Sequence, residues 1–133
     1  MSFSDPALRL RPDEAVERLV PILGEIDGEV VFCTCIDDDG FVGDSECFAS
    51  REQPKSTLPV EELFYLARTT GAPAMMFTSG SSGPIDQLQE CDVLFTRRLL
   101  DAGRACGVRV HDHFLVGGGT YRKMSESMDV WGH

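Results

Sequence analysis

The segment from Leu99 to Tyr121 constrains the fold most strongly, because three kinds of element follow one another within it. It begins inside an amphipathic pattern that runs from Asp86 to Cys106, with apolar residues three and four positions apart. Gly107 follows, a residue type that often ends helices. Two β-rich runs, Val108 to Val116 and Thr120 to Met124, are then joined by three glycines. The segment therefore predicts a helix that leads into a hairpin of two strands.

The upstream residues predict two further helices, another hairpin and one more strand. Helical spacing predicts a helix over 11–24, in which Pro21 should cause an end or a kink because it has no backbone N–H. The β-rich runs 29–36 and 41–48 flank Asp37-Asp-Asp-Gly40 and predict a hairpin. The remaining expected segments are an irregular stretch over 49–58, a helix over 59–71, a buried strand over 72–77 and a loop over 78–84.

The order of these elements predicts the fold class. Hairpins alternate with helical crossovers, so we expect an α/β protein with a three-layer arrangement, a mixed β-sheet flanked by helices. A length of 133 residues with 42% apolar residues suits one domain with a substantial core. We therefore expect a single domain over residues 1–133, with a short N-terminal helix and a C-terminal tail, 125–133, for which no element is predicted.

Charge and cysteine content restrict the partners and the compartment. The chain has 12 Lys and Arg against 22 Asp and Glu, a net charge of −10, which disfavours binding to nucleic acid. No run is long and apolar enough for a membrane span, and the N-terminus lacks a basic start followed by an apolar core, so a cytoplasmic protein without a membrane partner is expected. The odd number of cysteines predicts reduced, mostly buried thiols; they are Cys33, Cys35, Cys47, Cys91 and Cys106.

The segment 99–121, with its Asp112-His113 pair and glycine turn, resembles the RadC-like JAB/MPN domain family. The resemblance extends over roughly residues 28–125 and implies a JAB/MPN-like (cytidine-deaminase-like) architecture. In this family, two histidines of a His-x-His-Pro-Ser-Gly motif and the aspartate of a Ser-x-x-Asp motif hold zinc. A glutamate from the upstream hairpin acts as general base on the metal-bound water. The resemblance thus normally implies a zinc hydrolase.

The metal motif of the family is degenerate in this chain. Asp92, four residues before Thr96, matches the aspartate ligand, while Gln89 stands at the motif serine. Neither of two alignments supplies an imidazole at the former histidine positions, which are Ser79 and Ser81 without a gap, or Thr78 and Gly80 with one deletion. The remaining carboxylate and hydroxyls would bind zinc poorly. Asp92 is therefore expected to be a vestigial ligand.

The general base of the family is also displaced. Its position falls near Ala49 or Ser50, and the nearest carboxylates, Glu46 and Glu52, are two or three residues away. We therefore expect no catalytic residue, no metal and no cofactor. The resulting hypothesis is a catalytically inactive RadC-like JAB/MPN domain, a pseudoenzyme that acts as a protein-interaction or assembly module and binds another protein or a second copy of itself.

Two alternatives remain open from the sequence. One is a residual hydrolase, either a metal-dependent JAMM-type peptidase or isopeptidase with an atypical metal set or an enzyme acting without metal. His111 with His113, and Cys33 with Cys35, have ligand-like spacing, but His113 is expected to be structural and away from the metal centre, and the cysteines to pack in the core. A serine nucleophile is not expected, because no histidine is obviously placed as its base.

The other alternative is binding of a small anion through a Gly/Ser loop. Backbone amides of such a loop, between a strand and a helix N-terminus, can bind an anion, although a plain linker is the simpler interpretation. The loop residues are Thr78, Ser79, Gly80, Ser81, Ser82 and Gly83.

Overall fold

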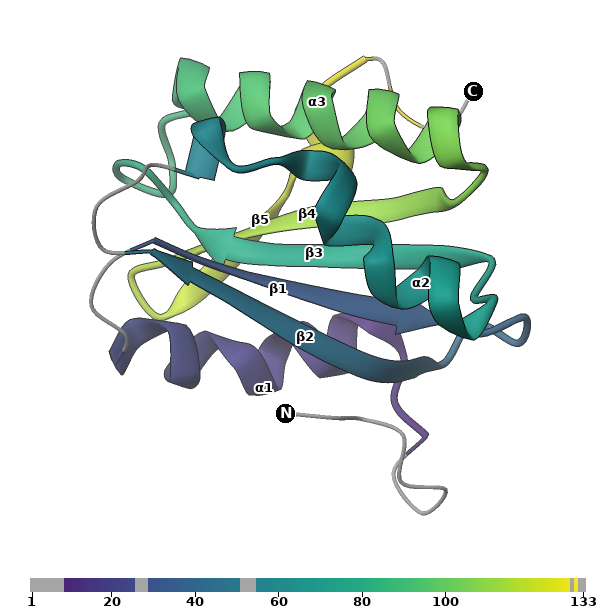
Figure 1. Cartoon of the computed structure of the whole chain (residues 1–133). Helices are drawn as coiled ribbons and strands as arrows, with labels where there is room; N and C mark the ends of the chain where they lie inside the picture. The colour runs from purple at the N-terminus through teal and green to yellow at the C-terminus, as the bar shows by residue number, and fades with distance from the viewer. Residues whose placement is uncertain (1–8, 26–28, 51–54, 130, 132–133) are drawn as a thin grey trace.

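The computed structural model describes residues 9–25, 29–50, 55–129 and 131, which form a mixed sheet covered on both faces by helices (Figure 1). The α-helix α1 covers one face, and α2 and α3 cover the other. The predicted three-layer α/β class is confirmed. The helices and strands are α1 Pro12–Glu25, β1 Glu29–Ile36, β2 Val42–Ser50, α2 Tyr65–Thr70, β3 Ala74–Gly80, α3 Glu90–Cys106, β4 Arg109–Gly117 and β5 Thr120–Lys123, with the 3-10 turns η1 Lys55–Thr57, η2 Val60–Phe64 and η3 Met124–Glu126.

The sheet has the strand order β2-β1-β3-β4-β5. All neighbouring strands are antiparallel except β3 and β4, which run parallel because α3 connects them as a crossover. Both predicted hairpins are confirmed. In the first, the Asp37 carboxylate accepts a hydrogen bond from the Phe41 N–H at 2.9 Å. In the second, Gly118 and Gly119 have φ angles of 58° and 76°, the left-handed values that a two-residue turn requires.

Side-chain alternation divides the sheet into two core layers, and this division decides which residues meet α3. In β3, Met75 and Phe77 pack in the layer under α2 and α3, whereas Ala74 and Met76 pack in the layer over α1. Strand alternation extends this pattern to the end of β3. Ser79 therefore faces α3, and Thr78 faces α1.

Helix α1 differs from the expectation at Pro21. The helix continues through this residue to Glu25, so of the two expected effects, an end or a kink, the end does not occur. Proline leaves the carbonyl of Glu17 without its helical partner. Both residues are on the exposed side of α1, where water can hydrate that carbonyl, and the buried stripe of the helix stabilises the remaining turns.

The boundaries around residues 78–90 also differ from the expectation. Residues 78–80 belong to β3, because they pair with β1 on one side and with β4 on the other, rather than to a loop. Helix α3 begins at Glu90 instead of Asp86, which leaves Leu88 in the preceding segment, 37% exposed. Upstream, the single helix expected over 59–71 is divided into η2 and α2, and Lys55–Thr57 in the expected irregular stretch forms η1.

Three of the five cysteines are exposed, so the expectation of mostly buried thiols is wrong. Cys33 and Cys35 are buried in β1, whereas Cys47, Cys91 and Cys106 are exposed, and all five are unpaired. The error in α3 has a clear cause: its core-facing stripe includes the polar residues Asp92 and Thr96, which the apolar periodicity did not select. None of the helices in the described ranges has the length and apolar content for a membrane span.

Gly103 fixes the packing of α3 against β4, and we expect Gly103→Ala to destabilise the fold. An added Cβ would lie 2.7 Å from the Val108 carbonyl oxygen, so backbone must shift. Overpacking of this kind costs about 1–3 kcal/mol. Urea unfolding of this variant should be compared with Gly24→Ala in α1, where a Cβ meets nothing within 4 Å. Equal stability of the two variants would contradict the close contact.

Candidate functional site

A buried polar cluster lies between the sheet and α3. Lys55 comes from η1, Ser79 from β3, Asp92 and Thr96 from α3, and His113 from β4. Lys55 is 1% exposed and the other four residues are fully buried. We call these five residues the Asp92 cluster. Polar groups buried this deeply are stable only when they satisfy one another, so their hydrogen bonds define the site.

The Lys55 ammonium is held by three acceptors. Its Nζ lies 2.6 Å from Asp92 Oδ1, 2.6 Å from the Gly80 carbonyl oxygen and 3.1 Å from Ser79 Oγ. An ammonium group has three N–H donors, so each donor has a partner and the group is satisfied in its charged form. The two opposite charges of Lys55 and Asp92 thus compensate each other inside the fold.

The Asp92 carboxylate has further partners in the segment after β3. Ser82 donates its hydroxyl to Oδ1 at 2.8 Å and its backbone N–H to Oδ2 at 3.1 Å. Together with Lys55, these donors occupy both carboxylate oxygens. The amide of the Gly/Ser loop that could bind an anion thus binds the chain's own aspartate. The segment does not lead straight into a helix N-terminus, since α3 begins only at Glu90.

Hydrogen-bond geometry orders the protons along the rest of the cluster. Thr96 donates its hydroxyl to the Asp92 carbonyl at 2.7 Å, so its oxygen accepts from His113 Nδ1, also at 2.7 Å. His113 Nε2 then accepts the Ser79 hydroxyl proton at 2.7 Å, and Ser79 Oγ accepts from Lys55. Burial, with a contribution from the Lys55 charge, lowers the pKa of His113 well below its usual range. The imidazole is therefore neutral at pH 7.

The position of His113 corrects two expectations. This residue was expected to lie away from the former metal centre, and no histidine was expected beside a serine of the segment 78–83. The fold brings His113 into hydrogen-bond contact with Ser79 because β3 and β4 are parallel neighbours whose odd-numbered residues here share the α3 face. Lys55, which sequence reasoning did not select at all, completes the cluster.

The residues present do not fit a zinc ion. Asp92 is the sole carboxylate of the cluster, and its oxygens are occupied by Lys55 and Ser82. The described ranges contain no group of three His, Cys, Asp or Glu residues arranged to hold a metal. Lys55 also places a positive charge 2.6 Å from the carboxylate, which opposes entry of a divalent cation.

One member of each set of candidate histidine positions contacts Lys55, and the other member does not. Ser79 lies in the Asp92 cluster, whereas Thr78 is buried with no hydrogen-bond partner for its hydroxyl and lies on the α1 side of the sheet. Gly80 contributes its carbonyl to Lys55. Ser81 donates its hydroxyl to the Gly83 carbonyl at 2.8 Å.

Glu46 does not join the Asp92 cluster. Glu46 in β2 pairs with Cys33 of β1, whereas Ser79 in β3 pairs with Val31 of β1. The two side chains are therefore offset by two residues along β1 and lie on opposite sides of this strand. Glu52 lies outside the described residues, and Ala49 and Ser50 end β2.

Of the four residues with ligand-like spacing, His113 belongs to the Asp92 cluster, and the other three do not. Cys33 and Cys35 pack in the core layer of α2 and α3. His111 stands at the irregularity in the pairing of β3 with β4, and its carbonyl accepts the Trp131 indole N–H at 3.1 Å.

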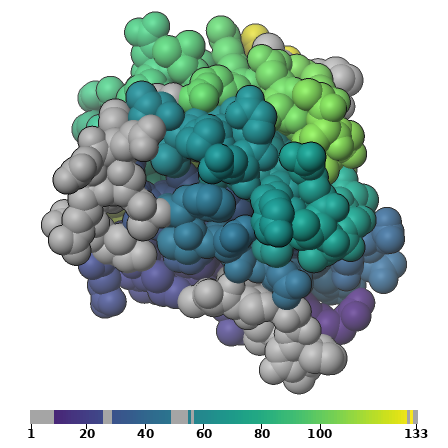
Figure 2. Space-filling model, in the orientation of Figure 1, coloured from purple at the N-terminus to yellow at the C-terminus, as the bar shows by residue number. Residues whose placement is uncertain are grey.

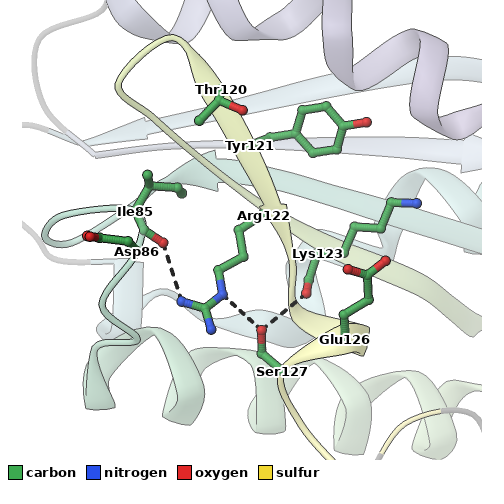
Figure 3. Close-up of a pocket in the computed structure, with 8 residues that line it drawn as sticks. All are labelled: Ile85, Asp86, Thr120, Tyr121, Arg122, Lys123, Glu126 and Ser127. Carbon is green, nitrogen blue, oxygen red and sulfur yellow. Dashed lines mark hydrogen bonds between the residues drawn. The ribbon is translucent and has the colours of Figure 1, made fainter.

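A cavity of about 720 Å³ lies along β5 (Figure 3). Arg122 crosses it and donates to Ser127 Oγ at 2.9 Å and to the Ile85 carbonyl at 3.3 Å. None of the residues that line this cavity belongs to the Asp92 cluster.

Comparisons with known proteins agree with this architecture. The family model described as RadC-like JAB domain matches residues 10–129. UPF0758 protein lwe1562 of Listeria welshimeri is 29% identical over 116 residues, which are 86% of this chain and 51% of that protein. UPF0758 protein STH371 of Symbiobacterium thermophilum is 28% identical over 117 residues, 86% of this chain and 49% of that protein. The chain thus spans about half the length of these relatives. Because the family model covers nearly all of its length, this chain belongs to the RadC-like JAB domain family.

Proposed function

We propose that this RadC-like JAB domain is catalytically inactive and acts as a protein-interaction or assembly module. The observation that carries the proposal is the contact of 2.6 Å between Lys55 Nζ and Asp92 Oδ1 in a fully buried position. The lysine supplies the positive charge that a carboxylate needs at this depth. An ammonium group cannot act as a Lewis acid or lower the pKa of a bound water as zinc does. The arrangement therefore supports a retained fold without the family's hydrolytic chemistry.

Zinc binding and hydrolysis test the inactive state together. After dialysis against buffer containing zinc and then against metal-free buffer, we expect the purified chain to retain well below one equivalent, measured by elemental analysis. Cleavage of isopeptide-linked and peptide substrates should not exceed the buffer blank. Asp92→Asn serves as the matched control and should give the same two results. One equivalent of zinc in the native chain that is lost in Asp92→Asn would contradict the proposal.

A hydrolase that uses Ser79 without metal is the second candidate. It is favoured by the contact of 2.7 Å between Ser79 Oγ and His113 Nε2, with Thr96 orienting the ring as the third member of a triad would. It is opposed by the complete burial of Ser79, which keeps substrate away from the hydroxyl. Treatment with a fluorophosphonate should leave the chain unlabelled. Labelling that disappears in Ser79→Ala and persists in Ser82→Ala would establish the serine enzyme instead.

A further inference from the structure

We propose that a groove between β2 and the η2–α2 segment, lined by acidic and aromatic residues, binds an arginine side chain of a partner protein. This inference rests on the proposed interaction function and names the chemistry of the partner. The groove has a volume of about 380 Å³, in the range of small-ligand sites. It is lined by Glu46, Phe48, Glu61, Glu62, Tyr65 and Arg68.

The fold brings these side chains together from two separate segments. Glu46 and Phe48 alternate with exposed Cys47 along β2, and Glu46 stands opposite Cys33, whose side chain packs in the layer under α2 and α3. Strand alternation therefore aims both side chains toward the η2–α2 side of the sheet. Figure 2 shows this face, with β2 in blue and η2–α2 in teal next to it. The groove is thus open on a face where a partner can approach.

An unpartnered carboxylate oxygen indicates that the ligand of the groove is a hydrogen-bond donor. Glu46 Oε2 is buried and has no hydrogen-bond partner. A buried acceptor without a donor is costly. Glu46 lines the groove, so a turn of its side chain toward the opening would bring this oxygen to an incoming N–H group and remove that cost. Glu61 and Glu62 add negative charge beside it, against the single cation Arg68. The groove and the net charge of −10 of the whole chain both favour a cationic ligand.

The aromatic walls distinguish arginine from lysine. Tyr65 is 60% exposed, the most exposed of the large apolar or aromatic side chains that the structure describes, and Phe48 is partly buried beside the core. A planar guanidinium stacks on an aromatic face while its N–H groups reach a carboxylate, and an ammonium lacks that flat surface. The combination of Tyr65 with the Glu46 carboxylate therefore fits a guanidinium best.

The test is a titration of the whole chain with the acetylated, amidated peptide Gly-Gly-Arg-Gly-Gly, followed by NMR amide shifts. We expect shifts at Glu46 and Tyr65 and a dissociation constant on the order of 1 mM. The same peptide with citrulline keeps the shape without the charge and should not bind measurably, and the lysine peptide should bind more weakly. Glu46→Gln and Tyr65→Ala should each weaken binding about tenfold, while Glu126→Gln on the β5 side should not. Arg68→Gln should strengthen binding because a competing cation is removed.

Three outcomes would overturn the inference. They are no measurable binding of the arginine peptide, equal binding of the arginine and citrulline peptides, and unchanged arginine binding in Glu46→Gln. None of these outcomes concerns the inactive state, which the zinc and hydrolysis measurements decide separately. If the chain holds no zinc and does not bind the arginine peptide, the proposed arginine site is refuted and the proposed function is not. A zinc-binding, hydrolytic chain that binds the peptide would do the reverse.

Discussion

Replacing Lys55 by methionine is expected to lower the free energy of unfolding by about 3–5 kcal/mol, the usual cost of removing one partner of a buried ion pair. The substitution keeps most of the side-chain volume but leaves the fully buried Asp92 carboxylate without its counter-charge. The Gly80 carbonyl and Ser79 Oγ lose a donor at the same time. Urea unfolding monitored by circular dichroism measures the difference.

A double-mutant cycle identifies the ion pair as the cause. Lys55→Met combined with Asp92→Asn removes both charges, so the double variant should be destabilised by less than the sum of the two single variants. Lys123→Met is the matched control, because Lys123 pairs with Asp13 at 3.0 Å on a partly exposed surface. It should cost at most about 1 kcal/mol. A Lys55→Met variant as stable as the Lys123→Met variant would contradict the account.

The second large effect is loss of stability in mild acid through His113. Burial and the Lys55 charge lower the pKa of His113 in the folded chain. As the pH falls through about 6.5, the imidazole is therefore protonated in the unfolded chain but stays neutral in the folded chain. This contribution to stability is complete above pH 6.5 and decreases below it. The expected slope approaches about 1.4 kcal/mol per pH unit as the pH falls below 6.5.

Two other groups near His113 also titrate. Burial lowers the pKa of His111, which acts in the same direction, and raises the pKa of Asp112, which opposes the loss at lower pH. Urea unfolding at pH 7.5, 6.5 and 5.5 should therefore compare the native chain with His113→Gln and His111→Gln. We expect the slope to flatten most in His113→Gln. The same slope in the native chain and in His113→Gln would show that this imidazole is not the acid-sensitive group.

The fold was largely predictable because its signals are local. Asp37-Asp-Asp-Gly40 and the glycines before Thr120 mark turns by their own chemistry, and both hairpins formed where the sequence predicts them. The end of β3 was not predictable in this way. Residues 78–80 are polar or glycine and resemble a loop, but strand pairing on both sides extends the strand through them. Tertiary contacts there override the local preference.

The candidate site was predictable only where it keeps the family motif. Asp92 follows from its spacing to Thr96. Lys55 does not, since it is an isolated lysine in a polar stretch 37 positions before Asp92, and its sequence surroundings are those of a solvated side chain. His113 has the right residue type, but its contact with Ser79 depends on the parallel pairing of β3 and β4. Long-range pairing of this kind leaves no periodic signal in the sequence.

The Asp92 cluster supports the proposed inactive state. The family resemblance implies that Asp92 holds the place of a zinc-binding aspartate; in this chain the Lys55 ammonium lies against that carboxylate, and Ser82 donates to both of its oxygens. Under the proposal, Lys55 supplies the positive charge that a metal ion would otherwise bring to this carboxylate.

A crystal structure determined from crystals soaked in zinc tests most directly whether Lys55, and not a metal ion, binds the Asp92 carboxylate. We expect Lys55 Nζ to remain at hydrogen-bond distance from Asp92 Oδ1, with no ion bound to that carboxylate and no anomalous zinc signal in the Asp92 cluster. An anomalous zinc peak on Asp92, with Lys55 displaced from the pocket, would contradict the account and return the domain to the metal-dependent hydrolases of its family.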